Sequence, residues 1–323
     1  MQKLTLILFF QVVLCKSIFM SKTKVVVTGG AGFMGSHLTD ALVKRGFDAH
    51  VIDDLSAGKM ENVNKGAIFH KEDIRNFEAV KKIIEGSKYV FHVAAKPRVQ
   101  ISIQNPRETH DINVNGTVNV LVAAKETGVK RIIYSSSSSA YGEQDMMPLN
   151  EDMPAQPISP YGLQKNIGEL ECRVFSKVYS IETVSLRYFN IYGPRLVSDG
   201  GAYDLVIGRF LKQRKEGKPM TIVPDGEQTR DFTHVKDVVN ANILAMLSDK
   251  VGKGEVVNIG AGKNYSVNRV AAIIGGPVVY IEPRLEPKHT LADNRRAKEL
   301  LGWEPKITLE EGIGELKKIW LNN

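Results

Sequence analysis

Cysteine is scarce in this sequence of 323 residues, which contains only Cys15 and Cys172. Two cysteines cannot build a disulfide framework or a C-x-x-C metal site, and such low usage favours a reducing compartment, the cytoplasm. Histidine offers no metal site either, because His234 and His289 show no metal-ligand spacing. We therefore expect a cytoplasmic protein that binds no metal.

Long hydrophobic runs are also lacking. The one conspicuous apolar run, Leu4–Leu14, is too short to cross a bilayer as a helix. The residues after it lack the small side chains of a signal-peptide cleavage site. Two interpretations of the extension 1–21 stay open, a signal or anchor and an over-long start. We favour the second, with translation beginning at Met20, because the folded pattern begins at Lys22. We expect no membrane contact in the mature form.

The excess of positive charge is small. Lysine and arginine number 43 against 36 aspartates and glutamates, which gives a net charge of +7. This excess is too small and too scattered to indicate a nucleic-acid partner, but it fits an anionic ligand. Hydrophobic residues at 43% and charged residues at 24% are ordinary for a globular protein, and the length predicts about two domains.

Short apolar runs alternate with helical segments through the first part of the chain. The predicted strands are 24–28, 49–52, 67–70, 89–93, 131–135 and 183–187, and the predicted helices are 32–45, 77–85, 106–127 and 161–179. This alternation predicts an α/β fold, a Rossmann-type doubly wound parallel sheet.

The alternation weakens after Tyr188, although 235–247 is helical and 256–260 is a strand that can rejoin the sheet. We expect a cofactor-binding domain over 22–187, rejoined by 233–260. A smaller α/β substrate-binding domain would then take 188–232 and 261–323.

A glycine-rich loop, T-G-G-A-G-F-M-G, joins the first predicted strand to the first helix at residues 28–35. Glycines at this place permit a tight turn and close approach of a dinucleotide diphosphate to the helix N-terminus. Asp53 ends the second strand 18 residues after Gly35, where a carboxylate binds the adenosine ribose and repels a 2′-phosphate. The loop therefore predicts NAD as cofactor, and Asp73 and Ile74, after the next strand, are positioned to meet the adenine.

Tyr161 and Lys165 are spaced by four residues and so share one face of a helix. A nearby ammonium is expected to lower the pKa of a phenol, which makes the phenol a better base. The serine cluster 135–139 ends the preceding strand, at the edge where open α/β sheets bind ligands.

Together these segments resemble the extended short-chain dehydrogenase/reductase superfamily. The glycine loop, Asp53, the run H-V-A-A at 92–95, S-S-S-S-S-A-Y-G at 135–142 and Y-G-L-Q-K at 161–165 occur in the family's order. R-Y-F-N-I-Y-G-P-R at 187–195 and D-G-E-Q-T-R-D-F at 225–232 resemble, more narrowly, nucleotide-sugar epimerases such as the UDP-glucose 4-epimerases. The resemblance covers 22–321.

The resemblance implies a role for each matching residue. Tyr161 would be the base, Lys165 would tune its pKa and hold the nicotinamide ribose, and Ser137, with Ser138 as its nearest competitor, would be the catalytic serine. The residues that match cofactor contacts are Gly29, Gly32, Phe33, Met34, Gly35, Asp53, Asp73, Ile74, Ala94 and Asn113, besides Tyr161 and Lys165. Those that match substrate contacts are Ser137, Asn190, Arg230, Arg284, Glu286 and Thr290.

The implied activity is inversion at C4 of a UDP-sugar by transient oxidation to a 4-keto intermediate. The substrate would be UDP-glucose or UDP-galactose, and the small Thr290 leaves room for the N-acetyl sugars UDP-GlcNAc and UDP-GalNAc. Another nucleotide-sugar epimerase or reductase, acting on UDP-glucuronate or on a GDP- or dTDP-sugar, stays an alternative, as does a non-catalytic NAD-binding protein. Relatives imply a homodimer.

Two departures from the family pattern bear on this hypothesis. Gln164 stands where the family usually has a small residue or serine. The acidic residues that dehydratases and decarboxylases carry beside the catalytic hydroxyl are serines here, which argues against both reactions. His92 ends an apolar strand, and we expect a packed or backbone-bonded histidine there rather than an acid or a ligand.

Overall fold

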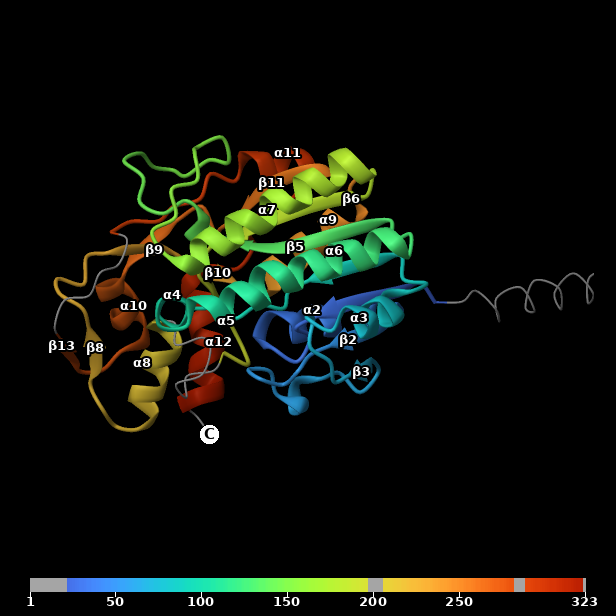
Figure 1. The fold of residues 1–323 in the computed structure, drawn as a ribbon. Helices are drawn as coiled ribbons and strands as arrows, with labels where there is room; N and C mark the ends of the chain where they lie inside the picture. The colour runs from blue at the N-terminus through green and yellow to red at the C-terminus, as the bar shows by residue number, and fades with distance from the viewer. Residues whose placement is uncertain (1–21, 197–205, 282–287, 322–323) are drawn as a thin grey trace, which may run out of the picture.

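Seven parallel strands form the central sheet of the computed structural model, which describes residues 22–196, 206–281 and 288–321. Their order across the sheet is β11 (Lys253–Ile259), β6 (Glu182–Tyr188), β5 (Arg131–Ser137), β4 (Tyr89–His92), β1 (Lys24–Thr28), β2 (Asp48–Ile52) and β3 (Ile68–His70). Every neighbouring pair is parallel. The order reverses direction between β1 and β4, where open α/β sheets bind their ligands. The predicted doubly wound α/β sheet is confirmed (Figure 1).

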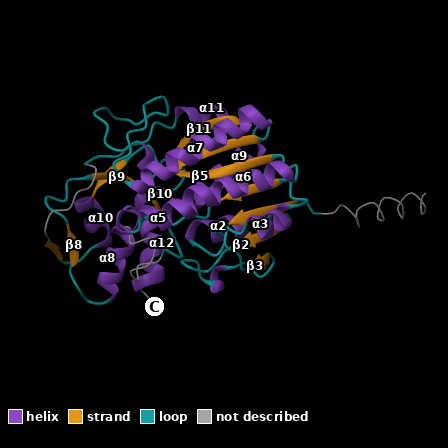
Figure 2. Cartoon of the chain, in the orientation of Figure 1, coloured by secondary structure: helices purple, strands orange, loops and turns teal. Residues whose placement is uncertain are grey.

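Helices cover both faces of this sheet (Figure 2). On one face pack α3 (Phe77–Ile84), α6 (Gly116–Glu126) and α7 (Pro160–Tyr179), and on the other α2 (Phe33–Lys44) and α9 (Val235–Leu247). Because helices cover both faces, the strands need not alternate apolar with polar residues. This arrangement explains why the strands read as short continuous apolar runs.

The long helix predicted over 106–127 is divided. It consists of α5 (Pro106–His110), a π-helical turn (Asp111–Asn115) and α6. A π-turn adds a residue to the helix and turns side chains out of the regular stripe, often at a functional position. Asn113 lies in the middle of that turn.

Short elements build the remainder, where sequence periodicity was weak. They are α4 (Val99–Gln104), β7 (Ile191–Tyr192), α8 (Val206–Lys215), β8 (Met220–Ile222), β9 (Thr229–Asp231), β10 (Thr233–His234), β12 (Asn264–Ser266), α10 (Val267–Ile274), β13 (Val278–Tyr280), α11 (Arg295–Leu301) and α12 (Leu309–Leu321), with 3₁₀ turns at Met60–Asn62 and Ser138–Ala140. Three two-stranded ribbons pair β7 with β10, β9 with β12 and β8 with β13.

Three sequence predictions fall outside the described residues: the extension 1–21, Arg284 and Glu286. Within the part of the chain that is described, no helix combines the length and the apolar character needed to cross a bilayer.

Candidate active site

The glycine-rich loop lies between β1 and α2, against the loop that follows β4. Gly29 has a φ of +72°, and a Cβ atom built on it would lie 2.8 Å from the Ala94 backbone. A Cβ atom on Gly35 would collide with the carbonyl oxygen of Gly29. Any side chain at either position would therefore force the turn apart or push α2 away from β1, so the chain needs glycine at both.

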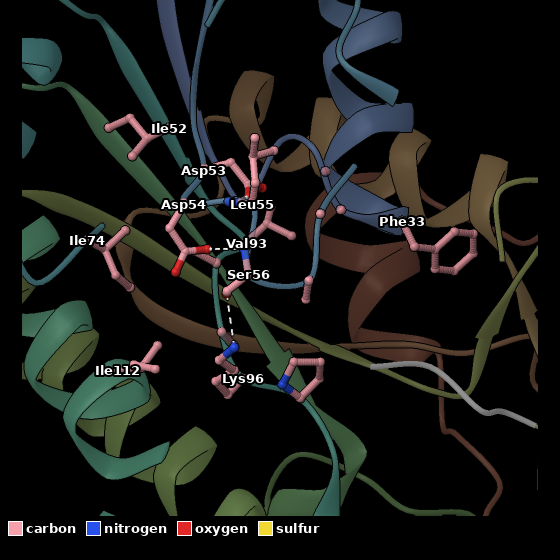
Figure 3. A pocket seen from close by; sticks show the side chains of 18 of the residues that line it. Phe33, Ile52, Asp53, Asp54, Leu55, Ser56, Ile74, Val93, Lys96 and Ile112 are labelled. Atoms are coloured by element: carbon pink, nitrogen blue, oxygen red, sulfur yellow. Dashed lines mark hydrogen bonds between the residues drawn. The ribbon is translucent and has the colours of Figure 1, made fainter. Parts of the chain in front are cut away.

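A cavity of about 430 Å³ opens above this loop (Figure 3). The loops after β1, β2, β3 and β4 all contribute to its wall. Most of the residues predicted to bind the cofactor line it, namely Gly29, Gly32, Phe33, Met34, Gly35, Asp53, Asp73, Ile74 and Ala94. Neighbours that the sequence did not single out, among them Ser56, Lys59 and Lys96, also line it.

Asp53 is held at the end of β2 by backbone amides. Its carboxylate accepts hydrogen bonds from the N–H groups of Leu55, at 2.9 Å, and Ala31, at 3.0 Å. Burial raises the pKa of this carboxyl, and the two amides oppose that rise. Each carboxylate oxygen has a second lone pair, so the group can still accept a hydrogen bond from a ribose hydroxyl.

Tyr161, Lys165 and Ser137 come together where β5 ends and α7 begins. Pro160 is the first residue of α7, and the Ser159 side chain caps the helix by accepting the N–H of Gly162 at 3.1 Å. The buried Lys165 Nζ donates to the carbonyl oxygen of Ser135 at 2.7 Å and lies 6.0 Å from the centre of the Tyr161 ring.

The pKa of Tyr161 differs from the sequence prediction. Burial raises it to about 12, and a hydrogen bond with Ser137 opposes the rise. The expected net lowering of this pKa is therefore wrong, because burial outweighs any effect of the Lys165 ammonium, which donates to the Ser135 carbonyl. Burial also lowers the pKa of Lys165 to about 8. The Tyr161 phenol is thus protonated at rest and shares a hydrogen bond with Ser137.

Gln164, the residue that departs from the family pattern, has a defined place. It is buried, accepts a hydrogen bond from Asn113 Nδ2 at 2.8 Å and donates one to the Thr109 hydroxyl at 3.0 Å. Asn113 also bonds both backbone groups of Lys96, at 2.7 and 3.1 Å. Gln164 therefore links the start of α7 by hydrogen bonds to the π-helical turn. Through Asn113 it is also linked to the loop after β4.

The backbone of Tyr161 itself is held by α4, an element the sequence did not predict. The buried Ser102 hydroxyl accepts the Tyr161 N–H at 3.0 Å and donates to the Val99 carbonyl at 2.7 Å. No local pattern in the mixed sequence V-Q-I-S-I-Q of α4 indicates this contact.

His92 is packed, as predicted, but its partners are side chains and not the backbone. Its Nδ1 lies 2.8 Å from the Thr28 hydroxyl and its Nε2 lies 2.9 Å from the Thr117 hydroxyl. The Thr117 hydroxyl donates to the Asn113 carbonyl at 2.7 Å, so it must accept from His92. These bonds assign the Nε2–H tautomer.

The neutral state of His92 has a measurable consequence at acid pH. Burial, aided by the Lys165 charge, lowers its pKa to about 3, whereas the unfolded chain protonates this histidine near pH 6.5. The unfolded state therefore binds the extra proton first, and the folded state loses stability as the pH falls below 6.5. We expect His92 to cost about 2 kcal/mol of the free energy of unfolding between pH 6.5 and 5.

The measurement is urea unfolding at pH 7, 6.5, 6 and 5 for the wild type and for His92→Asn. Asp231 acts in the opposite direction, because burial raises its pKa to about 6, so the difference between the two proteins is the informative quantity. The wild type should lose about 2 kcal/mol more than the variant. If the free energy of unfolding falls equally with pH in both proteins, His92 does not stay neutral.

A buried ion pair lies one helical turn beyond Lys165. The Glu169 carboxylate accepts from Arg187 Nε at 2.7 Å, from Arg187 Nη2 at 2.6 Å and from the Ser136 hydroxyl at 2.5 Å. The Arg187 guanidinium also stacks 4.3 Å from the Tyr141 ring centre. The four-residue spacing of Tyr161, Lys165 and Glu169 places the three side chains on one face of α7. Arg187 comes from β6, and only the fold brings it to Glu169.

Three of the residues predicted to bind substrate gather beyond the end of β6. Asn190, with a φ of +29°, donates to the Asp231 carbonyl at 3.1 Å and to the Thr290 hydroxyl at 3.4 Å. Arg230 precedes Asp231 in β9 and donates to the carbonyl of Thr229 at 3.0 Å. Since Ser137 pairs in register with Tyr188, this cluster follows directly on the strand next to the one that carries Ser137.

Comparison with known proteins gives consistent results. The model of the "NAD dependent epimerase/dehydratase family" matches residues 25–260. The putative UDP-glucose 4-epimerase of Methanocaldococcus jannaschii is 38% identical over 93% of this chain and 98% of its own length. The crystal structure of a UDP-glucose 4-epimerase from Thermotoga maritima, with UDP-glucose, is 38% identical, covers 92% of this chain and 99% of that one, and has a TM-score of 0.87.

A UDP-N-acetylglucosamine 4-epimerase from Methanobrevibacter ruminantium M1, in complex with UDP-N-acetylmuramic acid, is 36% identical, covers 94% of this chain and 99% of that one, and has a TM-score of 0.88. Sequence relatives and solved structures thus agree over nearly the whole chain, and the family model agrees with them over residues 25–260. The chain belongs to the NAD-dependent epimerase/dehydratase family, as a nucleotide-sugar epimerase of the extended short-chain dehydrogenase/reductase type.

Proposed function

We propose that this protein inverts C4 of a UDP-sugar, with Tyr161, Lys165 and Ser137 as its catalytic residues. The observation that carries the proposal is the meeting of these three side chains at the carboxyl end of β5, at the same edge of the parallel sheet as the cavity lined by the glycine loop. A general base, a cation and a hydroxyl at one point suit the removal of a proton from a sugar hydroxyl.

The cofactor site fits a dinucleotide. The cavity combines the N-terminus of α2, glycines that admit a diphosphate, and the Asp53 carboxylate for a ribose. When bound there, NAD⁺ supplies the hydride acceptor and donor at C4. Lys165, on α7, would hold the nicotinamide ribose, and Ala94 and Asn113 would hold the same end of the cofactor from the loop after β4 and the π-helical turn.

The protein residues would handle the proton. Tyr161 takes the proton of the 4-hydroxyl as the C4 hydrogen leaves, and Ser137 hydrogen-bonds the same oxygen and shares the proton with Tyr161. Burial makes the phenol a weak acid, so the positive charges of Lys165 and the oxidised cofactor are what would favour its phenolate. The 4-keto sugar must then turn over before it is reduced on its other face.

The smaller lobe, 188–232 and 261–323, would hold the rest of the substrate. Arg230 and Arg284 suit the diphosphate because a guanidinium binds two phosphate oxygens at once, and Asn190 and Glu286 would complete the nucleotide site. The small side chain of Thr290 would leave room for a 2-N-acetyl group, so both plain and N-acetylated UDP-sugars are proposed substrates. The N-acetylglucosamine epimerase among the similar structures supports this breadth.

The test is to incubate the pure protein with UDP-glucose, UDP-GlcNAc and UDP-glucuronate separately and to follow the anomeric proton by NMR. We expect conversion of UDP-glucose to UDP-galactose, and of UDP-GlcNAc to UDP-GalNAc, without net redox change. Conversion of UDP-glucuronate alone would instead establish the alternative substrate. No conversion of any nucleotide sugar by NAD-loaded protein would leave the non-catalytic alternative.

We also propose a homodimer formed through α7. Four large apolar side chains on one face of this helix are about half exposed or more: Leu163 at 48%, Leu170 at 48%, Val174 at 51% and Val178 at 61%. Their spacing of seven, four and four residues makes a continuous stripe, and such stripes mark contacts with a partner. Sedimentation equilibrium would give the mass of one chain if the proposal is wrong.

A further inference from the structure

A buried carboxylate, that of Asp231, lies at the centre of the predicted substrate site. Asp231 is the last residue of β9 and is completely buried. Its carboxylate accepts the backbone N–H groups of Ala261 at 2.6 Å, Gly262 at 3.0 Å and Ala292 at 3.1 Å. It therefore joins three segments that are far apart in the sequence: β9, the loop after β11 and the segment before α11.

The three predicted substrate residues beyond the end of β6 all contact or adjoin Asp231. Arg230 precedes it in β9. The Asn190 side-chain amide donates to the Asp231 carbonyl oxygen at 3.1 Å, and the Asp231 N–H donates to the Thr290 hydroxyl at 3.3 Å. Arg230, at the predicted diphosphate position, and Thr290, at the predicted sugar position, thus lie on segments that the Asp231 carboxylate helps to fix against each other.

The surroundings of this carboxyl favour its ionised form. Burial raises its pKa to about 6, and the three backbone amides oppose that rise. Protonation would make one of the two oxygens a hydroxyl, which is a poorer acceptor and needs an acceptor of its own. At least one of the three amides would then lose its partner, and an unpaired buried amide is destabilising. Near neutral pH, the ionised carboxylate therefore holds the three segments together.

Other charged groups lie on the segments around Asp231. Those that are charged, or can become charged, between pH 5 and 8 are Arg230, Lys263, Lys288, His289 and Asp293, from residues 188–192, 229–233, 260–266 and 288–293. The only histidine among them is His289, whose Nδ1 lies 2.9 Å from the Thr229 hydroxyl. Histidines take up protons in the same pH range as the Asp231 carboxyl. A test by pH must therefore separate the effects of Asp231 and His289.

We propose that Asp231 is a positioning residue for the UDP-sugar, whose carboxylate keeps Arg230 and Thr290 at the separation that the diphosphate and the sugar require. The inference rests on the proposed function. Asp231 acts without touching the substrate, since backbone amides enclose its carboxylate. Its loss should weaken binding of the nucleotide sugar and spare the cofactor site, which is built by the loops after β1, β2, β3 and β4.

The experiment compares Asp231→Asn with the wild type by calorimetry, with UDP and NADH as separate probes, and measures kcat and KM for UDP-glucose. Asparagine keeps the size of the side chain but turns one acceptor oxygen into an NH₂ group that faces a backbone amide. Asp237→Asn is the matched control, since the buried Asp237 carboxylate on α9 likewise accepts two backbone N–H groups, those of Lys306 at 3.1 Å and Ile307 at 3.0 Å. Urea unfolding of both variants shows whether their losses of stability match.

We expect Asp231→Asn to raise the Kd for UDP and the KM for UDP-glucose about 10- to 100-fold, because misplacing a positioning group by about 1 Å can cost up to about 10²-fold. The Kd for NADH and kcat should stay within about threefold of the wild type, since the cofactor loops and the residues on β5 and α7 are unchanged. Asp237→Asn should leave all four quantities within about threefold, even where its loss of stability is the same.

A pH series keeps the inference testable if Asp231→Asn does not fold. The probe is UDP-glucose, whose diphosphate is a diester of constant charge in this range, and the protein is Tyr161→Phe, which should bind the sugar nucleotide without converting it. Protonation of the carboxylate as the pH falls from about 7 to about 5 should raise the Kd about tenfold. The rise should persist when His289→Asn is added. A Kd that does not change with pH, or a rise that His289→Asn abolishes, would overturn the role of Asp231.

The failure of this inference and that of the proposed function give different results. If Asp231→Asn binds UDP as the wild type does, the positioning role is overturned while the proposed function stands. The same holds if Asp231→Asn weakens NADH binding as much as UDP binding, or if Asp237→Asn weakens UDP binding equally. If the wild type binds NADH but neither UDP nor a UDP-sugar, the proposed function is overturned, and with it this inference.

Discussion

Replacing Tyr161 with phenylalanine is expected to lower the turnover of a UDP-sugar roughly 10²- to 10⁴-fold, the range that a positioned general base contributes. The phenol oxygen is the atom that would take the proton of the 4-hydroxyl, and Ser137, its hydrogen-bond partner, cannot replace it because a serine hydroxyl is a far weaker acid. The ring stays in place, so UDP affinity should change by less than about threefold.

Tyr179→Phe is the matched control, since it makes the same change on the same helix at a half-exposed position near the other end. The readouts are the initial rate of epimerisation by NMR and the Kd for UDP by calorimetry. The loss should appear in kcat rather than KM, because the interaction is made with the reacting oxygen. A Tyr161→Phe protein that turns over near the wild-type rate would remove Tyr161 from the mechanism.

The parts of the site that the sequence could predict are those encoded in one short segment. The glycines of 28–35 must avoid the backbone of Ala94 and of Gly29 itself, so their pattern is fixed by sterics and visible in the sequence. Asp53 is recognisable by its distance from the loop, and Tyr161 with Lys165 by helical spacing. The alternation of apolar runs and helical segments was enough to predict the succession of the main strands and helices along the chain.

The parts that it could not predict are contacts between distant segments. Lys96 lines the cavity from the loop after β4 and Ser56 from the loop after β2. The two residues are far apart in the sequence, so no local spacing indicates that they meet. The π-helical turn at Asp111–Asn115 does not show in a pattern that reads as one continuous helix. The pKa of Tyr161 was predicted in the wrong direction because burial, which depends on the whole fold, outweighs the neighbour read from helical spacing.

Gln164 shows how an apparent departure from a family pattern can be understood once the fold is known. Its amide fills a gap between Asn113 and Thr109 with hydrogen bonds at both ends. With a smaller residue at this position, the Asn113 amide and the Thr109 hydroxyl would need water or another side chain as hydrogen-bond partner. The substitution therefore changes how the start of α7 is fastened, not which residues reach the reacting atoms.

The largest expected effect on stability comes from the Glu169–Arg187 pair. Both side chains are nearly inaccessible, with 3% and 5% of their surfaces exposed. Removing one charge leaves the other buried without its partner, which typically costs about 3–5 kcal/mol. We therefore expect Glu169→Gln to lower the free energy of unfolding by that amount, because the amide NH₂ cannot accept from the guanidinium that faces it.

Two comparisons make the cause of that loss testable by urea unfolding. Glu304→Gln breaks an exposed ion pair, in which the Glu304 side chain is 62% exposed and the Lys298 side chain 66%. This change should lower the free energy of unfolding by less than about 1 kcal/mol. The double change Glu169→Leu with Arg187→Met removes both charges, and it should recover much of the loss because no unpaired charge stays buried. If the double variant is as unstable as Glu169→Leu and Arg187→Met added together, the two residues do not act as a pair. Since Glu169 also raises the pKa of Lys165, the single variant should in addition move the alkaline limb of the pH–rate profile to lower pH, which a purely structural loss would not do.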